Sequence, residues 1–371
     1  MTGWRGNSQT SFACMHCDIA KRSMNSGIVP SRNFKNPIGL LFRMLTSGQR
    51  AAYSALIHEA LRLVSRPLNS LLAGRERRLR EAVPPVAAPV ILVVGAPRSG
   101  TTLVYQTLAR YLDVTYFSNL TSLFPDAPLA GTKMFRWLLR RQSADFKNFY
   151  GQTAGLNGPN DGFSVWNHWL GNDRYVPRTE LTADEQRSLG QFFRIWCAAF
   201  GKPFLNKNNR NAGCLNLLSQ AIPQCSFVVV RRNPLLVAQS LIKARQQVQG
   251  DKSAGWGLHS HSSDMTGDPL AYVDDVCDQV LQIEAELDKQ LKQIPQSRIV
   301  EFTYEGFCEE PDSILRWIAS RISGVRLKDD LVQSELRPFD VSATVTLSEI
   351  EMERLLSRLE SAEKATVIVN V

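Results

Sequence analysis

Apolar residues recur at three- and four-residue spacing in the stretch that begins near residue 49. The residues at this spacing are Tyr53, Leu56, Ile57, Ala60, Leu61 and Val64. Charged side chains and His58 fall between them, which is typical of an amphipathic helix. Because proline lacks a backbone N–H, Pro67 should stop or kink this helix, and we predict a shorter basic helix after it over residues 71–80.

Short, continuous β-branched runs indicate strands that are buried on both faces of a sheet. Two such runs, residues 90–94 and 226–230, are each followed by a turn and a helical pattern. Further strands are predicted over 113–117 and 298–302, and further helices over 271–294, 311–320 and 348–360. The last helix begins with Ser348 and Glu351 in a capping-box relation. The alternation of strand, turn and helix predicts a three-layer α/β fold with a central parallel sheet flanked by helices.

The composition changes twice along the chain. Residues 1–35 are rich in Ser, Asn, Gly and Arg without periodicity, and we predict a flexible lead. The lead contains C-M-H-C at Cys14 to Cys17, which is weak evidence for zinc or redox chemistry in the absence of a second such pair. Residues 36–88 form a basic amphipathic helical extension that ends in a P-P-V-A-A-P linker, and residues 89–371 form the α/β domain.

The chain has 371 residues, of which 44% are apolar, so it can bury a sizeable core. No run of about 18 uncharged apolar residues is present, and the N-terminus lacks the pattern of a secretory signal. We therefore expect a cytoplasmic protein. The seven cysteines are scattered without regular spacing, which favours reduced thiols over a disulfide framework.

Basic residues are concentrated toward the N-terminus. Residues 1–90 hold 13 Lys and Arg against 4 Asp and Glu, whereas the rest of the chain is nearly neutral. This charge could bring residues 36–80 into peripheral contact with an anionic membrane. The alternative is a solvated helical surface that packs on the main domain. Nucleic acid is not an expected partner, because aromatic interleaving and a recognisable nucleic-acid motif are both missing.

The turn after the first predicted strand reads G-A-P-R-S-G-T-T. It joins the carboxyl end of a strand to the N-terminus of a helix, where unpaired N–H groups and the helix dipole favour an anion. The glycines let the backbone curl around a ligand, Arg98 adds a cation, and three hydroxyl side chains add donors. Thr101 stands where an ATP-binding loop carries its lysine, which argues against a P-loop kinase or ATPase.

At these residues the chain resembles a known family. P-R-S-G-T-T-L, residues 97–103, is similar to the 5′-phosphosulfate loop of sulfotransferases that use 3′-phosphoadenosine 5′-phosphosulfate (PAPS), in their bacterial and Golgi-like branch. The family has a second marker, an Arg at a strand end and a Ser eight residues later that bind the 3′-phosphate. Arg232 and Ser240 have this spacing, and Arg231 misses it by one residue. Even without the family, such an Arg and Ser could flank a second anion if both strands lie close in one sheet.

The resemblance covers roughly residues 89–325 and implies a P-loop-type fold and a sulfotransferase activity with PAPS as donor and no metal. The donor-binding residues that it implies are Pro97, Arg98, Ser99, Gly100, Thr101, Thr102, Arg232 and Ser240. Lys207, in L-N-K-N-N-R-N, is the candidate for contacting the transferring sulfuryl group. T-Y-E-G-F, residues 303–307, resembles a structural segment of the family.

The chain departs from the family at the general base. Many members carry a Glu just after the second strand, but the corresponding Y-F-S-N-L-T holds no acid. The alternatives for removing the proton of the acceptor are Asp161, ranked first, and His168, ranked second. Asp161 could instead cap the helix that follows it, and His168, between tryptophans, could instead be a packed or hydrogen-bonded core residue.

The acceptor is expected to be a hydroxyl or amine on a small molecule, a lipid or a glycan. His259 and His261, in a Gly/Ser/His-rich loop, could line its site or be solvated. Phe163, Trp166 and Trp169 fit either an apolar or sugar-stacking pocket or a helix core. The competing hypothesis is a noncatalytic scaffold that binds PAPS or its product 3′-phosphoadenosine 5′-phosphate (PAP) while keeping the fold.

Overall fold

The computed structural model describes residues 34–139, 146, 148–328, 336–341, 344 and 346–369, without the side chains of 362–369. The chain divides into two compact units, Met1–Lys35 and Asn36–Val371, and the description below concerns the second unit. Cys14 and Cys17 lie outside the described residues. Among the described helices, none combines the length and the apolar character that crossing a membrane requires.

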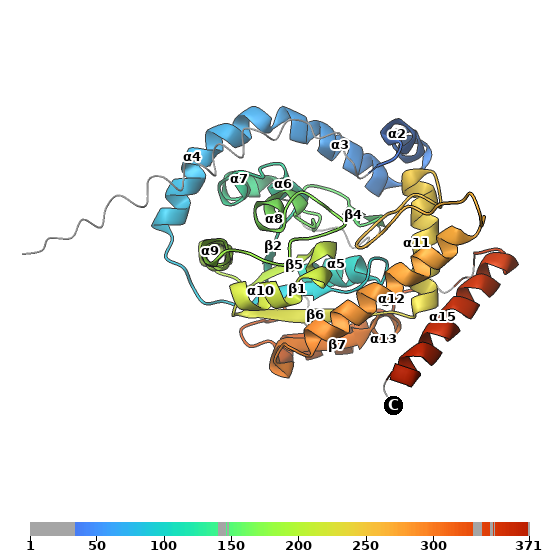
Figure 1. The fold of residues 1–371 in the computed structure, drawn as a ribbon. Helices are drawn as coiled ribbons and strands as arrows, with labels where there is room; N and C mark the ends of the chain where they lie inside the picture. The colour runs from blue at the N-terminus through green and yellow to red at the C-terminus, as the bar shows by residue number, and fades with distance from the viewer. Residues whose placement is uncertain are drawn as a thin grey trace, which may run out of the picture. The chain divides into compact units, whose positions relative to one another are not determined.

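A five-stranded parallel sheet forms the centre of the second unit (Figure 1). The strands are β1 (Val90–Val94), β2 (Thr115–Tyr116), β5 (Phe204–Lys207), β6 (Cys225–Arg231) and β7 (Ile299–Thr303), in the order β2-β5-β1-β6-β7. The central strand β1 pairs with β5 on one side and with β6 on the other, both in parallel. The carboxyl ends of these three strands therefore meet at one edge of the sheet, which is where ligands bind in open α/β folds.

Helices cover both faces of the sheet, as the strand patterns predicted. They are α5 (Thr101–Tyr111), α8 (Phe163–Leu170), α9 (Ala183–Phe200), α10 (Leu215–Ala221), α11 (Pro234–Ala244), α12 (Ala271–Leu291), α13 (Tyr304–Glu309) and α14 (Pro311–Arg321), and α15 (Glu349–Val369) packs on α11 and α12. Val90, Leu92 and Val94 pack into one buried cluster with α8, α9 and α10. Ile91 and Val93 pack into a second cluster with α5, α13 and α14. The side chains of β1 thus alternate between two cores, which makes the fold three layers of helix, sheet and helix.

Local differences from the prediction occur at short elements. The strand predicted over 113–117 pairs with β5 only at Thr115–Tyr116, because the Asp113 N–H bonds instead to the Arg326 carbonyl. A hairpin of β3 (Asn148–Phe149) and β4 (Gln152–Thr153) was not predicted. Shorter segments complete the described fold: α6 (Asn119–Ser122), α7 (Pro128–Phe135), η1 (Arg136–Leu138), η2 (Asn209–Gly213), η3 (Arg245–Gln249) and η4 (Gln296–Arg298). The capping box predicted for the last helix is present, with Ser348 Oγ accepting from Glu351 N at 3.4 Å.

Three helices form the N-terminal extension: α2 (Pro37–Thr46), α3 (Arg50–Val64) and α4 (Arg66–Ala82). They lie over α7 and the β3–β4 hairpin (Figure 1). The sequence pattern predicted that the helix after Pro67 covers residues 71–80 and is shorter than the helix before it. Instead α4 has 17 residues and is longer than α3, which has 15. The reason is that Pro67 falls in the first turn of α4, where the missing N–H has no intrahelical partner to lose.

One histidine joins α3 to the α/β core. The Nε2 atom of His58 lies 2.9 Å from the Asn119 carbonyl oxygen and 2.7 Å from Ser122 Oγ. Burial lowers the pKa of His58 below its ordinary value of 6.5, because the charged ring loses hydration. The neutral ring therefore stabilises the folded state above about pH 6.5, and this contribution is lost as the pH falls through the lowered pKa.

We expect the free energy of unfolding to decrease below about pH 6.5 and to decrease less in His58→Gln, which cannot take up the proton. Urea denaturation at several pH values between about 7.5 and 5 measures this slope. His261→Gln is the matched control, because the ring of His261 is exposed. Identical pH slopes for the wild type and His58→Gln would show that His58 protonation is not linked to folding.

Candidate active site

The loop between β1 and α5 has the backbone of an anion cradle. Gly100 is the N-cap of α5 with φ +89°, and Arg98 before it has φ +75°, so the chain turns sharply around the helix N-terminus. The N–H groups of Thr101 and Thr102 belong to the first turn of α5 and have no intrahelical acceptor. Ser99 Oγ is buried and has no hydrogen-bond partner among the described residues. The loop therefore presents donors that an anion would satisfy.

A second cation lies against this loop because β1 and β6 are neighbours in the sheet. Arg98 Nε donates to Ser240 Oγ at 3.0 Å, and Arg232 Nη1 donates to the Arg98 carbonyl oxygen at 3.0 Å. Arg98 of the phosphate loop thus contacts both members of the candidate 3′-phosphate pair. Burial lowers the pKa of Arg98, and the positive charge of Arg232 lowers it further. Two guanidinium groups held together in this way favour the binding of an anion between them.

Each of the two arginines stands over an aromatic ring. The guanidinium carbon of Arg98 lies 4.9 Å from the centre of the Tyr150 ring, and that of Arg232 lies 4.6 Å from the centre of the Tyr304 ring. The face of an aromatic ring attracts a cation and limits its rotamers. Glu305 adds an ion pair to Arg232, with 3.7 Å between Oε1 and Nε. The segment 303–307 therefore positions Arg232.

Arg231 points away from this arrangement. Its guanidinium group forms ion pairs with Glu284 and Asp288 on α12 and with Glu301 on β7, the last at 2.7 Å between Nε and Oε1. Successive side chains of a strand project to opposite sides, which separates Arg231 from Arg232. The structure therefore brings Arg232, and not its neighbour, to Arg98.

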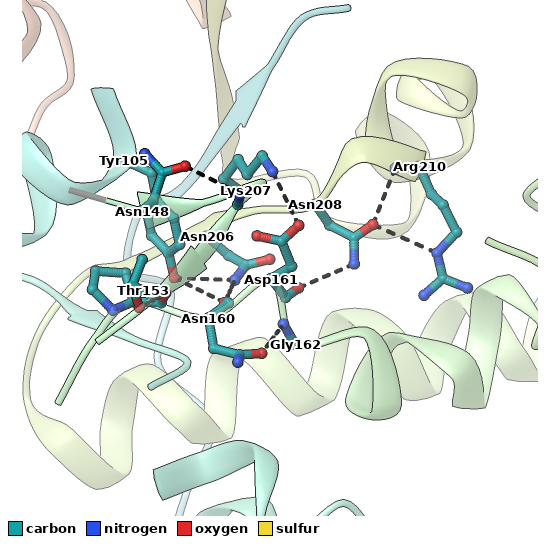
Figure 2. A network of polar contacts seen from close by, with 12 residues as sticks. Tyr105, Asn148, Thr153, Asn160, Asp161, Gly162, Asn206, Lys207, Asn208 and Arg210 are labelled. Carbon is teal, nitrogen blue, oxygen red and sulfur yellow. Dashed lines mark hydrogen bonds and ion pairs between the residues drawn. The ribbon is translucent and has the colours of Figure 1, made fainter. Parts of the chain in front are cut away.

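Lys207 and Asp161 form an ion pair at the end of β5. Figure 2 shows the two side chains pointing toward one another, with Nζ 3.0 Å from Oδ2. The side chain of Lys207 is 4% exposed and that of Asp161 is 14% exposed. The Asn208 side chain also donates to the Asp161 carbonyl oxygen at 3.0 Å. Asp161 and Lys207, which are 46 residues apart in the chain, are thus held as one unit.

A network of amides holds the Asp161 segment in place (Figure 2). Asn206 Nδ2 donates to Tyr105 Oη at 3.2 Å and to the Asn160 carbonyl oxygen at 3.1 Å. Its Oδ1 accepts from Trp166 Nε1 at 2.8 Å. The Asn160 side chain in turn accepts from Gly162 N at 2.8 Å. Because every one of these groups is partly or fully buried and bonded, the backbone on both sides of Asp161 has little freedom.

The turn of the β3–β4 hairpin connects the two halves of the site. A Cβ atom added to Gly151 would lie 3.8 Å from Thr102 Oγ1 and 3.9 Å from Lys207 Nζ. Tyr150, the preceding residue, is the one that lies under Arg98. Thr102, at the start of α5, and Lys207, at the end of β5, therefore face the same turn, and the ion pair lies beside the anion cradle.

Asp161 does not cap the helix that follows it. The N-cap of α8 is Gly162, and no side chain bonds to the first turn of this helix. The capping interpretation of Asp161 is therefore wrong, because the carboxylate is directed to Lys207 instead. His168 is not a core residue either: its ring is exposed, and Nδ1 lies 2.9 Å from the Val165 carbonyl oxygen of its own helix.

Trp166 and Trp169 belong to the core, with 0% and 6% exposure, so the helix-core alternative holds for both. Phe163 differs from them, because the guanidinium groups of Arg174 and Arg210 stand over its ring. His259 is partly buried, and burial lowers its pKa. His259 and His261 lie in the loop where Gly257 faces Pro97 of the anion cradle.

The sequence did not indicate several residues that shape this site. Tyr150 lies in a stretch without periodicity, and only its contact with Arg98 identifies it. Asn160 and Asn206 have side chains typical of turns, so their pattern indicated loops and not a buried network. Tyr304 was assigned a structural role only. Among the described residues, no group of three or more His, Cys, Asp or Glu side chains could hold a metal ion.

The anion cradle depends on the glycine at position 100. A Cβ atom there would lie 2.0 Å from Cδ2 of Tyr304, and the positive φ disfavours any other L-residue. We expect Gly100→Ala to lower the free energy of unfolding by roughly 2–5 kcal/mol, measured by urea denaturation. Gly201→Ala is the control, because Gly201 has φ +64° but open space around its Cβ position, and about 1–2 kcal/mol is expected there. Equal losses in the two variants would exclude the contact with Tyr304 as the cause.

Comparison with known proteins places this chain in a family. The family model described as "Sulfotransferase family" matches residues 89–328. A search of curated proteins gave no significant match.

Solved structures that match this chain include sulfotransferase STF9 from Mycobacterium avium, with 15% identity, a TM-score of 0.46 and coverage of 96% of this chain and 90% of that chain. Sulfotransferase STF1 from Mycobacterium tuberculosis has 12% identity, a TM-score of 0.45 and coverage of 86% and 84%. Because the family model spans well over half of the residues, the chain belongs to the sulfotransferase family.

Proposed function

We propose that the protein transfers a sulfuryl group from PAPS to a hydroxyl or amine of an acceptor. The observation that carries this proposal is the contact between Arg98, Arg232 and Ser240 beside the N-terminus of α5. PAPS has two separated anionic ends, a 5′-phosphosulfate and a 3′-phosphate. An anion cradle with a second cation and hydroxyl next to it matches such a ligand better than it matches a linear triphosphate.

The described residues divide between the two anionic ends. The N–H groups at the start of α5, with the side chains of Arg98, Ser99, Thr101 and Thr102, would hold the 5′-phosphosulfate. Ser99 Oγ, which is buried without a partner, fits this role because an oxygen of the ligand would satisfy it. Arg232 and Ser240 would hold the 3′-phosphate. In this proposal the hydrogen bond from Arg98 to Ser240 breaks when Arg98 binds the 5′-phosphosulfate and Ser240 binds the 3′-phosphate.

In the transfer, the bond from sulfur to the bridging oxygen of the donor breaks as the bond to the acceptor atom forms, and PAP leaves. Negative charge develops on the sulfuryl and bridging oxygens, where Lys207, Arg98 and the N–H groups of α5 would stabilise it. Asp161 would accept the acceptor proton, and the Asn206–Asn160 network would fix its position. Lys207 could serve both the transfer and the proton removal, because its ammonium group pairs with Asp161 and lies near the same Gly151 turn as Thr102.

Two measurements test this proposal together. Calorimetric titration with PAP and with PAPS measures binding, and mass spectrometry of host-cell extract incubated with the protein and PAPS detects sulfated products. Binding together with a product that requires the protein supports the transferase. Binding without any product favours a noncatalytic PAPS-binding scaffold. Absence of both would contradict the assignment of the anion cradle.

A further inference from the structure

The outer face of the helices α2, α3 and α4 is apolar. Nineteen large hydrophobic residues are exposed in the described part of the chain, and eleven of them lie in this segment. The eleven, which we call the outer face, are Ile38, Leu41, Phe42, Leu45, Tyr53, Ile57, Leu61, Leu63, Val64, Leu68 and Leu71. Exposures reach 81% for Ile38, 78% for Val64 and 79% for Leu71. Isolated exposed hydrophobic residues are ordinary, but a cluster on three consecutive helices marks an interaction surface.

Helix α3 shows most clearly that large apolar side chains face solvent while small ones are buried. It buries its small residues Ala51, Ala52 and Ala55 against the core and turns the large apolar residues outward. Tyr53, Ile57, Leu61 and Val64 recur at intervals of four, four and three residues, which places them on one side of the helix. Most of the predicted apolar stripe is therefore exposed, although α3 and α4 pack on the main domain through their other sides. Only Leu56 of the predicted stripe packs on the core beneath the helix.

The charge around the outer face is positive. Residues 36–80 contain eight Arg and no Lys, against two Glu and no Asp. Glu76 is 3% exposed and accepts the Ala130 N–H at 2.7 Å, so it is turned inward. Arg75 and Arg78 follow the exposed Leu71 by four and seven residues and are themselves exposed, so apolar and basic side chains share one side of α4. Apolar residues bordered by arginine are the composition of helices that lie in the surface of an anionic bilayer.

We propose that the outer face docks the protein on an anionic lipid bilayer, with α2, α3 and α4 lying in the plane of the interface. The apolar side chains would enter the boundary between headgroups and acyl chains, and the arginines would pair with anionic headgroups. Two other occupants fit less well. Residues 1–33 carry four Lys and Arg against one Asp, and a second copy would bring another basic face, so both would be repelled.

The inner side of the same helices contacts the candidate active site. Met44, Ala52 and Ala55 form a cluster with Phe149 of the β3–β4 hairpin, and Tyr150 packs on this cluster. Tyr150 is the residue whose ring lies under Arg98. Docking of the outer face would therefore place α2 and α3, which pack on the β3–β4 hairpin beside the candidate active site, against the membrane. The docking proposal does not depend on sulfuryl transfer, because it rests on exposure and charge alone.

Sedimentation of the full-length protein with lipid vesicles tests this proposal. Vesicles of phosphatidylcholine are compared with vesicles in which phosphatidylglycerol replaces part of it. We expect strong binding only to the anionic vesicles and weaker binding as salt is added. A variant with Ile38→Ser, Phe42→Ser, Ile57→Ser and Leu71→Ser is expected to bind at least about tenfold more weakly. A matched control with Val176→Ser and Trp317→Ser, exposed residues outside the outer face, is expected to bind like the wild type.

Circular dichroism and PAP titration establish that the variant with four serine substitutions, called the fourfold variant below, is folded. Failure of the wild type to bind anionic vesicles would overturn the proposal, and so would unchanged binding of the folded fourfold variant. A concentration-dependent dimer that the fourfold variant abolishes, without vesicle binding, would assign the outer face to a second copy instead. Vesicle binding without PAP binding would support the docking surface and contradict the proposed function, so the two failures are distinguishable.

Discussion

Replacing Arg232 by alanine is expected to weaken PAP binding by about 10- to 150-fold, the effect of losing charge-assisted bonds worth about 1.5–3 kcal/mol. The side chain of Arg232 is 8% exposed, and its guanidinium group lies over Tyr304 and contacts the Arg98 carbonyl oxygen, so it is held in a fixed position. Its assigned partner is the 3′-phosphate. Adenosine 5′-phosphate lacks this group, and Arg232→Ala should bind it within about threefold of the wild type.

The adjacent arginine provides the matched control. Arg231→Ala removes the same charge one residue earlier but disrupts only the ion pairs with Glu284, Asp288 and Glu301. Its affinity for PAP is expected to stay within about threefold of the wild type, because its guanidinium group is already paired with carboxylates and points away from Arg98. Isothermal titration of the wild type and both variants with both nucleotides gives a thermodynamic cycle that pairs removal of the arginine with removal of the 3′-phosphate. Equal weakening of PAP and adenosine 5′-phosphate by Arg232→Ala would contradict its assignment to the 3′-phosphate.

Replacing Asp161 by asparagine is expected to lower turnover by about 10²–10⁴-fold while PAP binds as before, if the carboxylate removes the acceptor proton. Asparagine keeps the shape of the side chain, and the bond from the Asn208 side chain to the backbone carbonyl oxygen of residue 161 is unaffected. It cannot accept a proton at neutral pH, so the rate should also lose the acid limb of its pH profile. A merely structural role would leave the shape of that profile unchanged.

Loss of the carboxylate also leaves Lys207 as a buried cation without its ion pair. Breaking such a pair costs about 3–5 kcal/mol of stability, so urea denaturation of Asp161→Asn must accompany the kinetic measurement. Asp113→Asn is the control: its carboxylate pairs with Lys202 at 2.5 Å, but both side chains are substantially exposed. It should cost at most about 1 kcal/mol and leave turnover unchanged. Normal turnover of folded Asp161→Asn would remove Asp161 from the mechanism.

Much of the fold was predictable from local pattern. The β-branched runs that became β1 and β6, and the helices after them, follow from side-chain periodicity and turn residues. The spacing of Arg232 and Ser240 was also visible, because it depends on one strand end and two turns of one helix. Local pattern did not predict the short elements correctly. Only two residues of the predicted strand 113–117 form β2, and the β3–β4 hairpin, with two residues in each strand, was not predicted.

The candidate site shows where local pattern stops. The chemistry of the loop G-A-P-R-S-G-T-T is set by neighbouring residues, so the sequence alone determined that an anion cradle follows β1. The strand order decided the rest: β1 lies between β5 and β6, and this brings Lys207 and Arg232 to the two sides of the cradle. It also decided that Asp161 meets Lys207 instead of capping a helix. The direction of the apolar stripe on α3 was likewise a tertiary outcome, because periodicity defines a face of a helix but not what lies against it.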